Sequence, residues 1–164
     1  MSKKPVQMIT PCLCFNDQAE AAVNFYVSLF PDSSIIHVTH CGPGEFGGTE
    51  GSVRTILFEL FGRQYLAVNG GPHFTFSEGI SFMVNCETQA ELDRYWLALT
   101  AGGREVQCGW LRDRFGVSWQ VVPAEMERMM TDPDPRKTQR VTQAMLKMVK
   151  LDIAALEAAF DGRG

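Results

Sequence analysis

The chain has 164 residues, of which 45% are hydrophobic and 21% charged, and its formal net charge is −4. This composition is typical of a folded globular protein and excludes a disordered or fibrous chain. The charges form no basic run, so we expect neither a nucleic-acid partner nor a membrane surface. The length predicts a single domain over residues 1–164 that buries a core without disulfides or metal.

The cysteines form an odd set, without a CxxC pair or a zinc-finger spacing. We interpret them as reduced thiols, most of them buried. They are Cys12, Cys14, Cys41, Cys86 and Cys108. The apolar stretch within Met1–Phe15 is too short for a signal-peptide core, and no later run approaches the ~20 residues of a membrane span. We therefore expect a cytoplasmic protein.

The first predicted elements are an alternating apolar strand at 7–15 and a helix that begins at Asp17. Asp17 and Glu20 have the spacing of a helix capping box, which satisfies free backbone N–H groups at a helix start. Three further strands complete the first module, and they are expected at 34–41, 52–61 and 63–69. The glycine-rich segment Gly42–Gly51 contains a GxGxxG match. Because a β-rich segment follows it instead of a helix, we interpret it as a hairpin loop and not as a dinucleotide site.

The second half of the chain repeats this order after a linker at 70–78. Thr88 and Glu91 form a second capping box, and the FGxx(aromatic)xxV pattern that starts at Phe61 recurs at Phe115. The strands of this half are expected at 79–86, 104–110, 111–114 and 117–122. The fold class is therefore α+β, with two tandem βαβββ modules at 6–69 and 79–123.

A helical tail is expected at 124–160. It should contain a short helix after Pro123, a break in the Asp-Pro-Asp-Pro segment at 132–135, and then one long helix of about 25 residues.

Alternation assigns the strand residues to two faces. One face is apolar and should meet the helices; it includes Ile9, Leu13, Phe15, Phe82, Val84, Cys86, Trp119 and Val121. The other face is semi-polar, which is expected of a small-molecule pocket, although a solvated or dimer-covered face would look the same. The candidate pocket residues are Thr10, Cys12, Cys14, Leu66, Ser81, Met83, Asn85, Trp110 and Gln120.

Four segments carry a family resemblance: Glu91–Trp96, Gln107–Trp110, Asp113–Pro123 and Ala144–Met148. They resemble the PhnB-like group of the vicinal-oxygen-chelate (glyoxalase/bleomycin resistance/dioxygenase) superfamily, a group labelled 3-demethylubiquinone-9 3-methyltransferase. The resemblance covers residues 6–123. It implies a duplicated βαβββ fold and a homodimer.

In metal-dependent relatives, the resemblance implies four metal-ligand positions in the first and last strands of each module. On this chain the matching positions are Thr10, Leu66, Ser81 and Gln120. None of them is a histidine or a carboxylate, and leucine has no donor atom. We therefore expect no metal and no cofactor.

The leading hypothesis is metal-free binding of a small apolar or amphipathic molecule in a β-sheet cavity. One alternative is a lyase, isomerase or transferase that uses Gln120, Ser81 and a cysteine; another is a dimeric scaffold without ligand. Methyl transfer lacks support, because no doubly wound region is predicted. Cys12 and Cys14 share a face and could act as a redox or covalent pair if exposed, but without a visible basic neighbour an inert lining is favoured.

Overall fold

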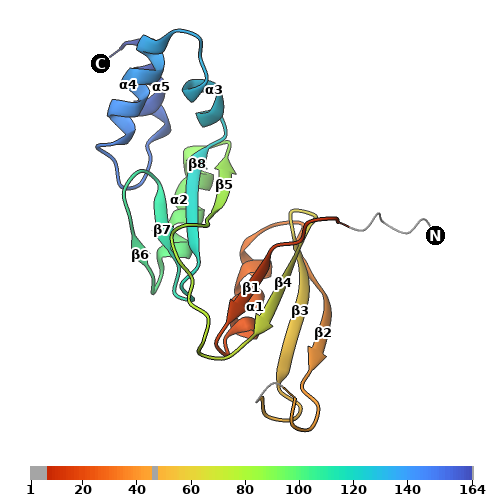
Figure 1. Ribbon diagram of the computed structural model, residues 1–164. Coiled ribbons are helices and arrows are strands. Elements are labelled where there is room, and N and C mark those ends of the chain that lie inside the picture. The colour runs from red at the N-terminus through yellow and green to blue at the C-terminus, as the bar shows by residue number, and fades with distance from the viewer. Residues whose placement is uncertain (1–6, 46–47, 164) are drawn as a thin grey trace, which may run out of the picture. The chain divides into compact units, whose positions relative to one another are not determined.

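The computed structural model describes residues 7–45 and 48–163. Phe46 and Gly47, which belong to the GxGxxG match, lie outside the described residues. The chain forms two units, Met1–Thr75 and Phe76–Gly164. Each unit contains a four-stranded mixed sheet with a helix against one face (Figure 1). The α+β class and the duplicated βαβββ order are confirmed. The single domain over 1–164 stays a prediction.

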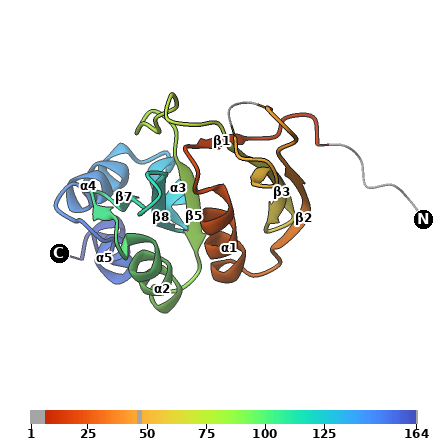
Figure 2. The same cartoon turned by 90° about the horizontal axis from the view of Figure 1, so that it is seen from below.

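The first unit is built on a sheet of strand order β1-β4-β3-β2. Its elements are β1 (Cys12–Phe15), α1 (Ala19–Leu29), β2 (Ser34–His40), β3 (Val53–Leu60) and β4 (Arg63–Asn69). Strand β1 is parallel to β4, and the other pairs are antiparallel. Helix α1 lies against one face (Figures 1 and 2), where Val23 and Tyr26 are buried together with Ile56 and Phe58 of β3. These four side chains form the centre of the first core.

The second unit repeats this plan with the order β5-β8-β7-β6. Its elements are β5 (Phe82–Cys86), α2 (Gln89–Thr100), β6 (Arg104–Glu105), β7 (Trp110–Arg112), β8 (Ser118–Pro123), α3 (Met126–Met130), α4 (Pro135–Met145) and α5 (Ile153–Asp161). Helix α2 buries Leu92, Tyr95, Trp96 and Leu99 against its sheet. Helices α4 and α5 lie side by side (Figures 1 and 2). Among the described helices, none has both the length and the hydropathy that a bilayer crossing requires.

The predicted first strand at 7–15 is too long, because β1 begins at Cys12. The side-chain amide of Gln7 occupies the backbone groups of Gln64: Oε1 accepts from Gln64 N (3.0 Å), and Nε2 donates to Gln64 O (3.0 Å). A longer strand would need these groups for its own ladder. The placement of Ile9 in the core is therefore wrong; its side chain is 86% exposed. Strands β5, β6 and β7 are also shorter than predicted.

Only the second predicted capping box is confirmed. Thr88 Oγ1 accepts from Glu91 N (3.2 Å), and Glu91 Oε2 accepts from Glu87 N (2.9 Å).

At the start of α1, by contrast, Asp17 does not cap the helix. Gln18 is the N-cap residue and its side chain makes no capping bond. The backbone N–H of Ala19 instead donates to Asn69 Oδ1 (2.9 Å), at the end of β4. The partner of this helix start comes from 50 residues away, which local sequence spacing cannot reveal.

The predicted long tail helix is wrong, because the tail contains α4 and α5 with a break at 146–152. In the break, Met148 O accepts from Cys108 N (2.9 Å) and Val149 O accepts from Gly109 N (2.8 Å). These carbonyl groups would otherwise belong to the helix ladder. Asp152 then starts α5 by accepting from Ala155 N (2.9 Å).

Candidate functional site

The uncovered face of the first sheet carries two rows of neighbouring side chains that cross all four strands. One row contains Cys12, Leu66, Leu57 and His37, and the next contains Cys14, Val68, Thr55 and Thr39. All eight are exposed or half-buried. Residues between them in sequence, such as Leu13, Ile56 and Ala67, are buried beneath α1. The mixed face predicted for Cys12, Cys14 and Leu66 therefore exists in this unit.

A cavity of about 470 Å³ opens on this face, within the range of small-molecule sites. It is lined by Cys14, Arg54, Thr55, Val68, Asn69, Gly70 and Phe74. Its surface is mainly apolar, and a Cβ atom at Gly70 would come within 2.9 Å of the Phe74 ring. Glycine at this position is therefore needed for Phe74 to close the cavity wall.

Polar groups lie at the edge of the same cavity. The Arg54 guanidinium forms an ion pair with Glu45 (3.0 Å), and Thr55 Oγ1 shares a hydrogen bond with Thr39 Oγ1 (2.6 Å). An apolar surface beside a cation and hydroxyl groups suits an amphipathic molecule with a polar or anionic end. Sequence reasoning missed Arg54, Thr55 and Val68. The alternation at 53–59 carries a signal for Thr55, but Arg54 falls at a register shift between β2 and β3, which alternation does not reveal.

The second sheet has a corresponding face in its own unit, which is only partly exposed, since Ser118 and Val122 of β8 are buried on it. Met83, Gln120 and Trp110 form one row across β5, β8 and β7, and Asn85 lies beside Val122. Gln120 Nε2 donates to Ser81 Oγ (2.9 Å). Met83 is 54% exposed. The structure thus groups the second-module candidates within this unit, although Ser81 precedes β5.

The four positions matching metal ligands in the superfamily do not fit a divalent transition ion. Thr10 precedes β1, Leu66 offers no donor atom, and Ser81 and Gln120 already bond to each other. Such ions take imidazole, thiolate or carboxylate ligands. Within residues 7–45 and 48–163, no group of three or more His, Cys, Asp or Glu side chains could hold a metal ion. A metal-free site stays a prediction.

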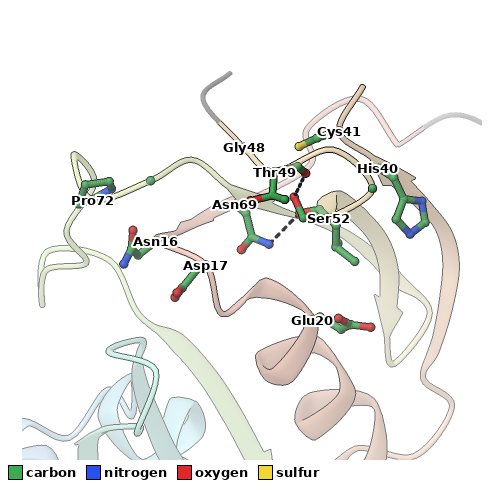
Figure 3. Close-up of a pocket in the computed structure, with 13 residues that line it drawn as sticks. Asn16, Asp17, Glu20, His40, Cys41, Gly48, Thr49, Ser52, Asn69 and Pro72 are labelled. Carbon is green, nitrogen blue, oxygen red and sulfur yellow. Dashed lines mark hydrogen bonds between the residues drawn. The ribbon is translucent and has the colours of Figure 1, made fainter. Parts of the chain in front are cut away.

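A second, more polar cavity of about 740 Å³ lies at the start of α1 (Figure 3). It is lined by Asn16, Asp17, Glu20, His40, Cys41, Gly48, Thr49, Gly51, Ser52, Val53, Asn69, Gly71 and Pro72. The Asp17 and Glu20 side chains come from the start of α1, and His40 comes from the end of β2. With two carboxylates and no Lys or Arg in the lining, this cavity favours neutral or cationic polar groups over anions. Sequence reasoning missed it.

Asn69 lines both cavities and holds their shared wall. Its Oδ1 atom accepts from Ala19 N, and its Nδ2 atom donates to Val53 O (2.9 Å; Figure 3). Both ends of the side-chain amide are therefore committed to backbone groups. Asn69 fixes the start of α1 relative to β3 and β4.

The thiols of the first unit differ in accessibility. Cys12 is exposed and Cys14 half-buried, whereas Cys41 is buried. Partial burial, and then the neighbouring Cys14 thiol, raise the pKa of Cys12 above its usual value. Since the thiolate is the nucleophilic form, this environment does not activate Cys12 as a nucleophile.

The family model for 3-demethylubiquinone-9 3-methyltransferase matches residues 7–122. Among solved structures, the PhnB protein from Bacillus cereus is similar with 34% identity and a TM-score of 0.65, covering 71% of this chain and 99% of that one. Protein PA1353 from Pseudomonas aeruginosa has 21% identity and a TM-score of 0.60, covering 72% and 98%.

The fosfomycin resistance protein FosX from Listeria monocytogenes shares the fold with 15% identity and a TM-score of 0.51, covering 76% of this chain and 97% of that one. No curated protein matches the chain.

Proposed function

We propose that this protein binds a small amphipathic molecule without metal. The premise is its family: the chain belongs to the 3-demethylubiquinone-9 3-methyltransferase family, a PhnB-like branch of the vicinal-oxygen-chelate superfamily. The observation that carries this proposal is the 470 Å³ cavity on the uncovered face of the first sheet. Its apolar surface would hold the body of the molecule. Arg54, at the edge of the cavity, would face a polar or anionic end.

Metal-free binding is supported by the chemistry of the four ligand positions. Leu66 supplies no donor, and the hydrogen bond between Gln120 and Ser81 uses polar atoms of both side chains. Neutral hydroxyl and amide oxygens do not balance the charge of a divalent transition ion. Binding in this proposal therefore relies on burial of apolar surface and on a few polar contacts.

Methyl transfer, which the family's name describes, finds no support in the described residues. Their sheets are four-stranded and mixed, without the parallel doubly wound architecture whose glycine-rich turns hold nucleotide-like cofactors. A lyase or isomerase that uses Gln120, Ser81 and a cysteine remains the enzymatic alternative. Loss of turnover in Gln120→Ala would favour it. A scaffold without ligand is the third reading.

The proposal includes a cytoplasmic homodimer. Strands β1 and β5 are edge strands of their sheets, and the exposed Ile80 and Met83 lie at or just before β5. Unpaired strand edges with apolar side chains are favourable surfaces for association with another chain. Sedimentation equilibrium at several protein concentrations measures this state directly, and a monomer at every concentration would contradict it.

The ligand proposal is tested by fluorescence titration with anilinonaphthalene sulfonate, a probe with an apolar body and an anionic end. We expect saturable binding, because the probe matches the cavity in chemistry. Val68→Asp places a carboxylate on the apolar surface and should weaken binding at least about tenfold, which corresponds to about 1.4 kcal/mol. Arg54→Gln should weaken binding several-fold.

The matched control is Arg63→Gln, which removes an exposed arginine that does not line the cavity. It should leave the titration unchanged. Thermal unfolding of each variant separates lost binding from lost folding. Equal probe affinity in wild type, Val68→Asp and Arg54→Gln would contradict the proposal.

A further inference from the structure

Cys12 and Cys14 form an accessible pair of thiols on the edge of the first sheet. Strand β1 is the outermost strand, and both cysteines lie on its uncovered face. Cys12 is exposed and Cys14 half-buried. Partial burial, and then the neighbouring Cys14 thiol, raise the pKa of the Cys12 thiol. The sequence left open whether this pair is exposed, and the structure answers that question.

Arg54 lines the same cavity as Cys14. It lies on β3, two strands away from β1 in the sheet. Sequence spacing does not place it there. Its guanidinium is paired with Glu45 (3.0 Å), so its positive charge is offset by that carboxylate.

The strand geometry disfavours a disulfide between these thiols. Residues two apart in a strand are separated by about 6.6 Å, and their side chains leave the sheet in the same direction. A disulfide needs Cβ atoms at about 3.5–4.5 Å, so it would distort the strand. An ion bound to both sulfurs, with each metal–sulfur distance at about 2.3 Å, holds the two sulfur atoms about 4.6 Å apart. The pair is therefore better suited to hold an ion than to form a bond.

The number of donors selects the kind of ion. His37 shares the row of Cys12 but lies on β2, three strand spacings or about 14 Å away. Within the described part of the chain, no third His, Cys, Asp or Glu completes a cluster. Zinc requires about four ligands, whereas soft ions such as copper(I) are selected by sulfur ligands alone.

We propose that Cys12 and Cys14 bind one soft monovalent ion of the copper(I) or silver(I) type between their two sulfurs. In the binding step, two neutral thiols and one M⁺ ion give a bis-thiolate complex of charge −1 and release two protons. Leu66 and Val68 lie beside the two cysteines on β4 and shield one side of the complex from water. This site goes beyond the proposed ligand cavity, because Cys12 does not line that cavity.

The test is native mass spectrometry of the reduced full chain, titrated without oxygen with copper(I) buffered by a competing chelator. We expect one ion per chain, and the release of two protons per ion measured in weakly buffered solution. Cys12→Ser and Cys14→Ser should each lower the affinity at least about a hundredfold, because a single thiolate remains. Silver(I) should bind at the same two positions.

Cys108→Ser is the matched control, since Cys108 is half-buried in the second unit. It should bind copper(I) like wild type. Cys12→Ser should also leave the binding of anilinonaphthalene sulfonate unchanged, which separates this site from the ligand cavity. Retention of the ion by the variant with both Cys12→Ser and Cys14→Ser would overturn the proposal. Tighter binding of zinc than of copper(I) would overturn it too. So would a chain that binds the dithiol reagent phenylarsine oxide but does not bind copper(I).

Discussion

Gln120 donates a hydrogen bond from Nε2 to Ser81 Oγ over 2.9 Å, and thereby joins the residue just before β5 to β8. Both residues stand at positions that the family resemblance matches to metal ligands, and neither is a histidine or a carboxylate. In this protein the two side chains satisfy each other. The contact joins residues that are 39 apart in the chain.

This pair should be measurable in a double-mutant cycle. We expect Ser81→Ala and Gln120→Leu to show a coupling of about 1 kcal/mol in urea unfolding, because a partly buried neutral hydrogen bond contributes about 0.5–1.5 kcal/mol. Ser28→Ala, on α1 in the other unit, serves as the control partner. Its effect should add to that of Gln120→Leu, and additivity of Ser81→Ala as well would contradict the contact.

Asn69 should contribute more to the stability of the first unit than its position at a strand end suggests. Asn69→Ala removes the cap of α1 at Ala19 and the bond to Val53 O, and should destabilise the first unit by about 2 kcal/mol. Asn69→Asp keeps an acceptor for Ala19 N but loses the donor to Val53, so its cost should be smaller. Thermal and urea unfolding measure both variants, and equal stability of Asn69→Ala and wild type would refute the capping role.

Asp113 is a buried carboxylate that organises the turn between β7 and β8. Its Oδ1 atom accepts from Phe115 N (2.9 Å) and Val117 N (3.0 Å), and its Oδ2 atom accepts from Trp119 Nε1 (2.9 Å). Asp113→Asn sets an amide N–H against the indole N–H, so we expect a loss of about 2 kcal/mol in the free energy of unfolding.

Trp119→Phe provides the control for this prediction, because it removes the indole donor. Asp113→Asn should cost less in the Trp119→Phe background than in wild type. If the cost in urea unfolding is the same in both backgrounds, the indole bond is not the cause.

Cys86 should make the second unit sensitive to alkaline pH. Burial, and then the Glu91 carboxylate, raise the pKa of Cys86 from 9.0 to about 12. The folded protein keeps the neutral thiol, whereas the unfolded chain ionises above pH 9. The contribution of Cys86 to the free energy of unfolding is therefore complete below about pH 9. It decreases as pH rises toward about 12, by about 1.4 kcal/mol per pH unit.

Urea unfolding between pH 8 and pH 11 tests this dependence. Cys86→Ala should flatten the decrease in stability by about one titrating group. Val84→Ala, which shortens a buried side chain on the same face of β5, should lower stability by a similar amount at every pH. Parallel curves for wild type and Cys86→Ala would exclude the thiol as the cause.

The element order could be predicted from the sequence because its signals are local. The Thr88 capping box, the apolar stripe of α2 and the Asp134-Pro135 start of α4 lie within a few residues of the structures that they specify. Predictions failed where a distant group intervened. Gln7 replaced the backbone pairing expected at 7–11, Asn69 replaced Asp17 as the cap of α1, and the loop at 108–109 interrupted the tail helix.

The candidate site divides in the same way. By itself, the sequence determined the family, the two repeated modules and the alternation that places Cys12, Cys14 and Leu66 on one face, because a strand has a fixed period of two. Only the tertiary structure decided which side chains from other strands stand beside them. Arg54 and Phe74 reach the cavity beside Cys14 because strand pairing and the turn at Gly70 bring them there. Such neighbours depend on long-range register, which has no signature in local sequence spacing.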